Sequence, residues 1–223
     1  MSVRIPAIAV IDYGMGNRRS VEKAIERAGA TVSVTHDRDE LRAADGLVLP
    51  GVGAFPLAMR NLKQLGLADL IPEEIARGTP LLGICLGMQL LFESSDELET
   101  TPGLGLLPGK VTALDAGRLR LPHIGWNEVR FERSSRLTAG FPARGCPFYH
   151  VHSFAPRPDD GRDVVGTTEY GERFATIVEH YAVWGVQFHP EKSSEDGLRL
   201  LGNFAALCAG GPLESTRPAA LRA

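Results

Sequence analysis

The sequence is poor in cysteine, in long apolar runs and in excess charge of either sign. Its 223 residues contain three cysteines, a sparse and odd number that argues against a disulfide framework and favours reduced thiols in a cytoplasmic protein. A formal net charge of −3 and a pI near 6.1 provide no attraction for nucleic acid or for an anionic membrane. No apolar stretch approaches the length that spans a bilayer, so we expect a cytoplasmic protein with neither of these partners.

What the sequence does have is an ordinary globular composition, 43% hydrophobic and 23% charged, and enough length for one sizeable core. The apolar start is interpreted as a strand and not as a signal peptide. In the first half, strands are predicted within 6–11, 31–36, 45–51 and 79–85, and helices within 20–29, 57–66, 72–78 and 86–95. Pro72 is expected near the first turn of its helix and Gly78 at the end. This alternation predicts a parallel sheet covered on both faces.

The second half is β-rich, and it closes with one amphipathic helix. Strands are predicted within 105–114, 123–131, 148–154 and 173–191, and the helix within 195–208. The tail, residues 211–223, lacks an apolar period and is expected to be frayed. The prediction is a single α/β domain over residues 1–210, with a mainly parallel central sheet flanked by helices.

The segment Gly83-Ile84-Cys85-Leu86-Gly87 has the spacing of a nucleophile elbow, with cysteine in place of serine. At such a strand-to-helix turn the backbone of the nucleophile is strained, and the flanking glycines permit close packing. The turn presents the thiol at the carboxyl edge of the sheet and at a helix N-terminus, which favours the thiolate. Cys85 is therefore the candidate nucleophile, whereas Cys208 suits a packing role in the last helix and Cys146 is unassigned.

A thiolate catalyst needs a base and a group that orients the base. The segment G-V-Q-F-H-P-E-K-S, 185–193, supplies His189 and Glu191, which would share one face if the segment were extended. The segment P-G-V-G-A-F, 50–55, ends another strand in a glycine-flanked turn, where the amide of Val52 can join that of Leu86 as an oxyanion donor.

Six motifs, in this order along the chain, resemble those of the class I (triad) glutamine amidotransferases, and most closely those of the HisH family, the glutaminase subunits of imidazole glycerol phosphate synthase. They are D-Y-G-M-G-N (12–17), P-G-V-G-A-F (50–55), G-I-C-L-G-M-Q-L-L-F-E-S-S (83–95), P-H-I-G-W-N (122–127), Y-H-V-H-S-F (149–154) and G-V-Q-F-H-P-E-K-S (185–193). The resemblance implies a class I amidotransferase domain. It also implies that glutamine is hydrolysed to glutamate and ammonia.

The resemblance assigns roles residue by residue. Cys85 would form a glutamyl thioester, and His189 and Glu191 would complete the triad. The amides of Val52 and Leu86 would form the oxyanion hole. In this family Val52 would first reorient so that its N–H faces the site, which would leave the resting enzyme nearly inactive. Substrate-binding positions match Gly53, Gln89, His152 and Ser153, and partner-interface positions match Asn17, Trp126, Tyr149 and Lys192. Phe154 departs from the pattern, because relatives often have tyrosine there, which puts a hydroxyl contact to the substrate in doubt.

The resemblance also implies a partner, and neither a cofactor nor a metal. Ammonia released into open water would be protonated and lost, and the family passes it to a HisF-type (β/α)8 barrel cyclase subunit. The chain lacks the length and the repeated pattern of such a barrel, so a heterodimer is expected. The products would be glutamate here, and imidazole glycerol phosphate and AICAR at the barrel, in histidine biosynthesis.

Four alternatives compete with this interpretation. Gly14-Met15-Gly16 between a strand and a helix suggests a dinucleotide-binding turn, but position 19 is arginine where a third glycine is expected. His123, His150 and His152 suggest a metal site, but no cysteine or carboxylate with ligand spacing accompanies them. The chain can also be the glutaminase of another synthase, such as anthranilate synthase, or a non-catalytic homologue kept for assembly.

Overall fold

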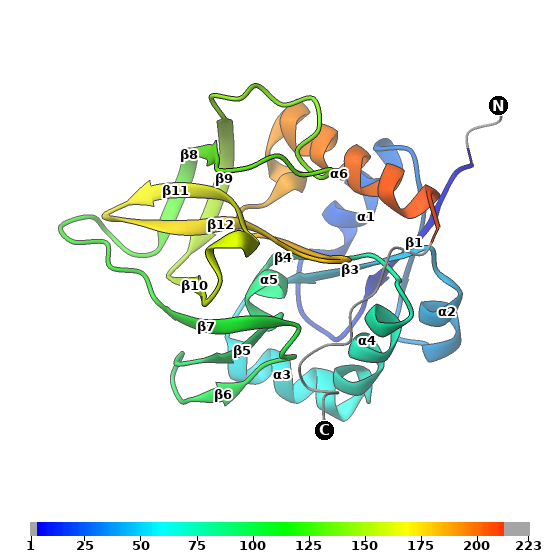
Figure 1. Cartoon of the computed structure of the whole chain (residues 1–223). Coiled ribbons are helices and arrows are strands. Elements are labelled where there is room, and N and C mark those ends of the chain that lie inside the picture. The colour runs from blue at the N-terminus through cyan, green and yellow to red at the C-terminus, as the bar shows by residue number, and fades with distance from the viewer. Residues whose placement is uncertain (1–3, 212–223) are drawn as a thin grey trace.

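Two sheets organise the computed structural model, which describes residues 4–211. The larger sheet has nine strands in the order β2-β1-β3-β4-β13-β12-β11-β8-β9, and helices pack on both of its faces (Figure 1). The smaller sheet has four strands in the order β10-β7-β5-β6. The α/β class and the central sheet flanked by helices, which the sequence predicts, are confirmed.

The first five strands of the large sheet run parallel to one another. They are β2 (Thr31–Thr35), β1 (Ala7–Ile11), β3 (Gly46–Gly51), β4 (Leu81–Cys85) and β13 (Val183–Val186). Every residue of β3, β4 and β13 is buried, as expected for parallel strands that are covered on both faces.

The remaining four strands of the large sheet are antiparallel. They are β12 (Glu172–His180), β11 (Val164–Tyr170), β8 (His123–Phe131) and β9 (Cys146–His152). The small sheet contains β10 (Phe154–Pro158), β7 (Leu107–Ala113), β5 (Phe92–Ser95) and β6 (Thr101–Pro102). The chain passes from β9 into β10 through Ser153 alone, so this residue joins the two sheets.

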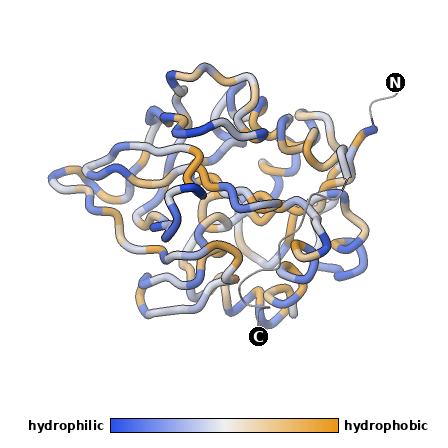
Figure 2. Tube along the Cα trace, in the orientation of Figure 1, coloured by the Kyte–Doolittle hydropathy of each residue, from blue (hydrophilic) through white to orange (hydrophobic). Residues whose placement is uncertain are grey.

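The helices enclose two buried clusters, one on each face of the parallel strands. One face carries α1 (Arg18–Arg27) and α6 (Ser194–Ala209); the other carries α2 (Arg38–Ala43), α3 (Phe55–Gln64), α4 (Leu67–Ala76) and the short α5 (Leu86–Leu90). Two 3₁₀ turns, η1 (Gly161–Asp163) and η2 (Pro190–Lys192), complete the elements within residues 4–211. Apolar residues gather along the central strands and polar ones at the periphery (Figure 2).

The predicted helix near Pro72 is longer than the sequence suggests, and the proline lies inside it. Helix α4 begins at Leu67, after Gly66 in the left-handed conformation. Leu67, Leu70 and Ile71 are fully buried. Tertiary packing therefore stabilises the part of the helix before Pro72, which the local sequence does not predict.

The prediction of one helix over 86–95 is wrong. Helix α5 ends at Leu90, and residues 92–95 form β5. Ser94 and Ser95 pair with Lys110 and Val111 of β7, and these pairings outweigh the local helical spacing. The sequence analysis also missed α2, which has one buried residue but is capped by Asp37, whose side chain accepts hydrogen bonds from Asp39 N and Glu40 N.

Two further predictions concern the ends and the membrane. The predicted frayed tail lies, beyond Gly211, outside the described residues, and the domain boundary at residue 210 stays a prediction. Within residues 4–211 no helix is long and apolar enough to cross a membrane.

Candidate active site

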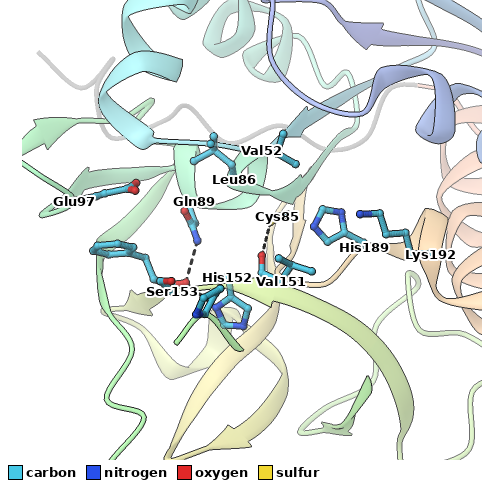
Figure 3. Close-up of a pocket in the computed structure, with 13 residues that line it drawn as sticks. Val52, Cys85, Leu86, Gln89, Glu97, Val151, His152, Ser153, His189 and Lys192 are labelled. Atoms are coloured by element: carbon cyan, nitrogen blue, oxygen red, sulfur yellow. Dashed lines mark hydrogen bonds between the residues drawn. The ribbon is translucent and has the colours of Figure 1, made fainter. Parts of the chain in front are cut away.

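A pocket of about 240 Å³ opens at the carboxyl ends of β3 and β4 (Figure 3). Gly51 and Cys85, the last residues of these strands, are register partners, so the loop after β3 and the elbow after β4 lie side by side. The opposite wall comes from the junction of β9 and β10. Such strand ends are where open α/β sheets bind ligands.

Cys85 occupies the strained corner that the sequence predicts. Its φ is +55°, a left-handed conformation that is uncommon for a residue with a side chain. A Cβ on Gly87 would overlap the carbonyl oxygen of Leu49, and a Cβ on Gly83 would lie 2.7 Å from the carbonyl oxygen of Gly87. Both glycines are therefore required by close backbone approach, and the elbow geometry is confirmed.

The Cys85 side chain is almost enclosed at this corner. Its Sγ lies 3.6 Å from the carbonyl oxygen of Val151 on β9, and Gln187 Nε2 lies 3.8 Å from the sulfur. Burial raises the pKa of the other two thiols, Cys146 and Cys208, to about 12. Those two remain protonated, which suits a packing role and not a nucleophilic one.

His189 and Glu191 face Cys85 as a buried pair. His189 Nδ1 lies 2.9 Å from Glu191 Oε1, and the two side chains are only 4% and 1% exposed. Burial by itself lowers the pKa of His189, but hydrogen bonds and charge interactions with Cys85 and Glu191 outweigh burial and raise that pKa to about 10. The geometry therefore favours an imidazolium next to the sulfur.

The route by which Glu191 reaches His189 differs from the predicted one. Pro190–Lys192 is a 3₁₀ turn and not an extended segment. The turn is held against β9 by tertiary bonds, since His189 N donates to Tyr149 O at 2.9 Å and Ser193 Oγ accepts a hydrogen bond from Tyr149 N at 3.0 Å. The structure therefore brings the two predicted side chains into contact, but not through the extended backbone that the sequence analysis assumed.

Val52 and Leu86, the predicted oxyanion donors, lie together on one side of the pocket (Figure 3). Val52, the first residue after β3, is 43% exposed. The Pro50–Gly51 peptide at the end of β3 is held by the buried hydroxyl of Tyr13, which donates to Pro50 O at 2.7 Å. Gly53 follows with φ +104°, which favours glycine.

The predicted substrate-binding residues all line this pocket, but their polar atoms are engaged in different ways. Gln89 Nε2 donates to Phe154 O at 3.0 Å and to Gln187 Oε1 at 3.1 Å. Both ring nitrogens of His152 have protein partners. The side chain of Gln89 thus ties the elbow helix to the opposite wall, and neither ring nitrogen of His152 is free for a ligand.

Glu97 is a charged pocket residue that the sequence analysis missed. Glu97 lines the end of the pocket away from His189 (Figure 3), and its Oε2 accepts a hydrogen bond from Phe55 N at 2.8 Å. It places a carboxylate where a ligand amino group can be bound. The surrounding acidic segment, 96–99, reads as an ordinary exposed turn, so no local signal distinguishes Glu97.

Three of the predicted partner-interface residues gather beside the pocket. The rings of Trp126 and Tyr149 are 6.1 Å apart, and Lys192 Nζ lies 6.0 Å from the centre of the Tyr149 ring. Trp126 is 54% exposed, and Lys192 also lines the pocket. Asn17, the fourth, is an exposed residue before α1 and makes no side-chain cap.

The geometry does not favour the two ligand-binding alternatives. In the glycine turn, Gly14 N donates to Asp12 Oδ1, which also pairs with Arg18. The ring nitrogens of His123, His150 and His152 are all engaged in hydrogen bonds within the protein. Within the described part of the chain, no cluster of histidine, cysteine or carboxylate residues has the arrangement of a metal site.

Comparison with known proteins agrees with this geometry. Residues 9–207 match the family described as glutamine amidotransferase class-I. The chain is 54% identical over 200 residues to "Imidazole glycerol phosphate synthase subunit HisH" of Moorella thermoacetica, covering 90% of this chain and 94% of the relative. It is 50% identical over 196 residues to the protein of the same name from Aquifex aeolicus, covering 87% and 94%.

Solved structures show the same fold at low sequence identity. A GMP synthase protein of Thermoplasma acidophilum superposes with a TM-score of 0.71 at 20% identity, over 93% of this chain and 96% of that one. The structure of PurLQS from Thermotoga maritima gives a TM-score of 0.71 at 22% identity, over 90% and 98%.

Proposed function

The chain belongs to the class-I glutamine amidotransferases and, among them, to the family of imidazole glycerol phosphate synthase subunit HisH, and on this premise we propose that it hydrolyses glutamine to glutamate and ammonia through a thioester on Cys85. The observation that carries the proposal is the strained Cys85 elbow facing the buried His189–Glu191 pair across one pocket.

His189 and Cys85 act together in the first step. The imidazole takes the thiol proton, and the sulfur attacks the carboxamide carbon of glutamine. The imidazolium then protonates the leaving nitrogen as the carbon–nitrogen bond breaks, and ammonia departs. Glu191 holds the ring through Nδ1 and stabilises its charge. In the second step His189 activates water, which attacks the thioester and releases glutamate.

The negative charge that develops on the carboxamide oxygen is stabilised by backbone amides. Leu86 N at the start of α5 and Val52 N after β3 are the donors we assign, because both residues border the pocket beside the sulfur. Removing such a donor typically costs roughly 2.7–4 kcal/mol of transition-state stabilisation.

Residues on both sides of the pocket bind the glutamine. Gly53 and Gln89 belong to the elbow side, and the β9–β10 junction, with His152 and Ser153, forms the opposite wall. The Glu97 carboxylate at the far end is suited to the α-amino group, which carries the complementary charge.

The ammonia is delivered to a partner. The relatives carry the name of a synthase subunit, and we assign a HisF-type (β/α)8 barrel cyclase as the second subunit. Trp126, Tyr149 and Lys192 form an aromatic and cationic cluster at the pocket, which with Asn17 would contact the barrel. The barrel would then form imidazole glycerol phosphate and AICAR in histidine biosynthesis.

The test measures glutamate release from glutamine by the chain alone, and then with the barrel partner and its phosphoribosyl ligand. We expect low activity alone and a rise by orders of magnitude in the complex. Cys85→Ala should abolish release, by roughly 10⁴-fold or more, without loss of complex formation, and Cys146→Ala is the matched control with normal activity.

Two results would count against parts of the proposal. High glutamate release that does not depend on the barrel would support the glutaminase activity but contradict the assignment to this synthase. It would favour a role in another pathway, such as anthranilate synthesis. Unchanged release by Cys85→Ala would remove the thioester mechanism itself.

A further inference from the structure

Three buried histidines, His123, His150 and His152, lie on the β8–β9 side of the pocket, outside the Cys85–His189–Glu191 constellation, and only His152 among them lines the pocket. His123 opens β8, and it is the register partner of His152 at the end of β9. The ring of His123 is stacked between Tyr170, at 4.0 Å, and His150, at 4.9 Å. The mechanism above uses neither His123 nor its stacking partners.

Hydrogen bonds run in one direction through this group, and they determine the tautomers. His152 Nδ1 lies 2.9 Å from Phe154 O, which can only accept, so this nitrogen carries a proton and Nε2 is an acceptor. His123 Nδ1, 3.0 Å from His152 Nε2, is therefore the donor of that pair. His123 Nε2 is left as an acceptor for Asn127 Nδ2, at 3.2 Å.

The far end of this series is determined as well. Asn127 Nδ2 also donates to Glu169 O at 3.0 Å, and Asn127 Oδ1 accepts from Glu128 N at 2.9 Å. A carbonyl and an amide N–H thus orient the side chain of Asn127 in one way only. Donation then runs from Asn127 to His123, from His123 to His152 and from His152 to Phe154 O. We name these three side chains and the Phe154 carbonyl the relay.

The relay ends on the junction between the two sheets. Phe154 O accepts from both His152 and Gln89, and Ser153 O accepts from Leu114 N. The carbonyl of Val151, just before the junction, lies 3.6 Å from Cys85 Sγ. The orientation of the His152 ring therefore bears directly on the wall that faces the nucleophile.

We propose that His123 is a positioning residue for the glutaminase reaction: through the bond from its Nδ1 to His152 Nε2 it holds the β9–β10 junction in the conformation that binds glutamine opposite Cys85. This role rests on the proposed function. His123 itself is buried and does not line the pocket, so it acts through His152.

The protonation of the relay is consistent with this role. Burial lowers the pKa of His123 to about 4 and that of His152 to about 3, and it lowers the pKa of His150 well below its ordinary value. All three rings stay neutral at neutral pH. A neutral pair has one acceptor for each donor, and two imidazolium rings at this spacing would repel each other.

The experiment compares three variants of the full chain in complex with the barrel partner. His123→Leu removes the donor, and His123→Asn places an amide N–H near the position of Nδ1. His150→Leu is the matched control, because His150 is buried in the same group but bonds to Phe148 O and Thr176 Oγ1, outside the relay. For each variant we would measure KM for glutamine, kcat for glutamate release and the temperature of thermal unfolding.

We expect His123→Leu to raise KM for glutamine about tenfold, as for a buried acceptor left without its partner, and to change kcat by less than about threefold. His123→Asn should recover most of the lost affinity. His150→Leu should lower the unfolding temperature without raising KM. If KM for glutamine rose equally in His123→Leu and His123→Asn, the proposal would be overturned in favour of general packing. The same conclusion would follow if His150→Leu raised KM as much as His123→Leu.

A second measurement does not depend on turnover. Nitrogen-15 NMR of the histidine rings in the free chain should show neutral His123 and His152, both protonated on Nδ1, which is the minor form of free histidine. Asn127→Ala should let the Nε2-protonated form of His123 appear. An Nε2-protonated His123 in the wild-type chain would refute the relay, whereas a wild-type complex without glutamate release would refute the proposed function.

Discussion

The parallel and antiparallel halves of the large sheet build the two sides of one pocket by different means. On the parallel side, the nucleophile is held by backbone strain and by the absence of side chains at Gly83 and Gly87. On the antiparallel side, the wall is held by hydrogen bonds between buried polar side chains, among them His123 and His152. One side is specified by shape and the other by donor and acceptor pairing.

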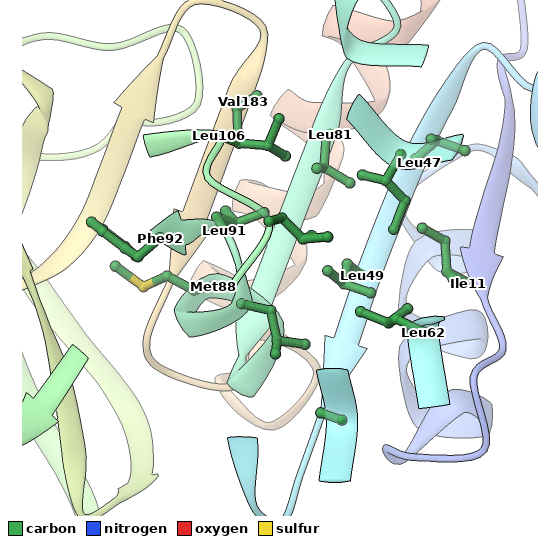
Figure 4. Close-up of a cluster of buried hydrophobic side chains, with 14 of the residues drawn as sticks. Ile11, Leu47, Leu49, Leu62, Leu81, Met88, Leu91, Phe92, Leu106 and Val183 are labelled. Carbon is green, nitrogen blue, oxygen red and sulfur yellow. The ribbon is translucent and has the colours of Figure 1, made fainter. Parts of the chain in front are cut away.

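The difference follows from what surrounds each side. The parallel strands are covered on both faces, and leucines such as Leu49 and Leu81 pack with Met88 in an apolar cluster beside the elbow (Figure 4). The hydroxyl of Tyr13 in this cluster is paired with Pro50 O, and the close-packed interior transmits any added volume as strain. The antiparallel wall contains buried imidazoles and amides, whose cost is recovered only when each is paired.

The largest effect is expected from a methyl group added on the parallel side. Gly87→Ala places a Cβ against the carbonyl oxygen of Leu49, and backbone cannot move aside as a flexible side chain does. We predict a loss of about 3 kcal/mol in the free energy of unfolding, measured by urea denaturation, together with loss of glutamate release.

The matched control for this substitution lies at Gly161 in η1, where an added Cβ has no neighbour within 4 Å. Gly161→Ala should change the free energy of unfolding by less than about 0.5 kcal/mol. Similar losses in both variants would show that shape at the elbow is not the special requirement that the comparison assigns to it.

A smaller effect is expected where the two sides meet at His189. The folded-state pKa of His189, about 10, lies above its ordinary value of 6.5. The pairing therefore stabilises the fold fully below pH 6.5 and loses this contribution as the pH rises through about 10. Glu191→Gln removes the partner charge, so we predict a loss of about 2 kcal/mol near pH 6 that shrinks toward pH 10.

Urea unfolding at several pH values between 6.5 and 10 checks this prediction. The exposed Glu195, three residues after the end of η2, provides the control, because Glu195→Gln should leave the pH dependence as in the wild type. A variant Glu191→Gln whose deficit stays constant over this range would contradict the raised pKa of His189.

The smallest effect is expected from a polar pair of the antiparallel side that lies outside the relay. Thr176 Oγ1 lies 2.9 Å from His150 Nε2, and both residues are fully buried. Thr176→Val keeps the shape and removes the donor, so we predict a loss of about 1 kcal/mol in the free energy of unfolding. Glutamate release should be normal. A rise in KM for glutamine in this variant would contradict the claim that only the hydrogen bonds of the relay affect glutamine binding.

Several predictions from sequence failed where the partner of a segment lies far away in the chain. Residues 92–95 have helical spacing but pair with β7 in the second sheet. Glu191 reaches His189 through a 3₁₀ turn, and His189 N and Ser193 Oγ, on either side of Glu191, form hydrogen bonds with the backbone of the distant Tyr149 on β9. Local pattern carries no information on these partners, which are chosen when the sheets assemble.

The sequence by itself determined the parallel half of the large sheet and the elbow at Cys85. Buried strands, helical spacing and the two glycines around Cys85 are local signals, because strain and close approach act within a few residues. The motifs around His189 also identified the second part of the candidate site.

Only the tertiary structure decided how the pocket is closed. Glu97 belongs to an acidic turn that borders the pocket only in the folded chain. Hydrogen bonds connect Asn127 to His123 and His123 to His152 across β8 and β9. A hydrogen bond depends on distances of a few tenths of an ångström and on the proton position of each partner. Such partners are brought together by the register of distant strands, which no single segment of the sequence contains.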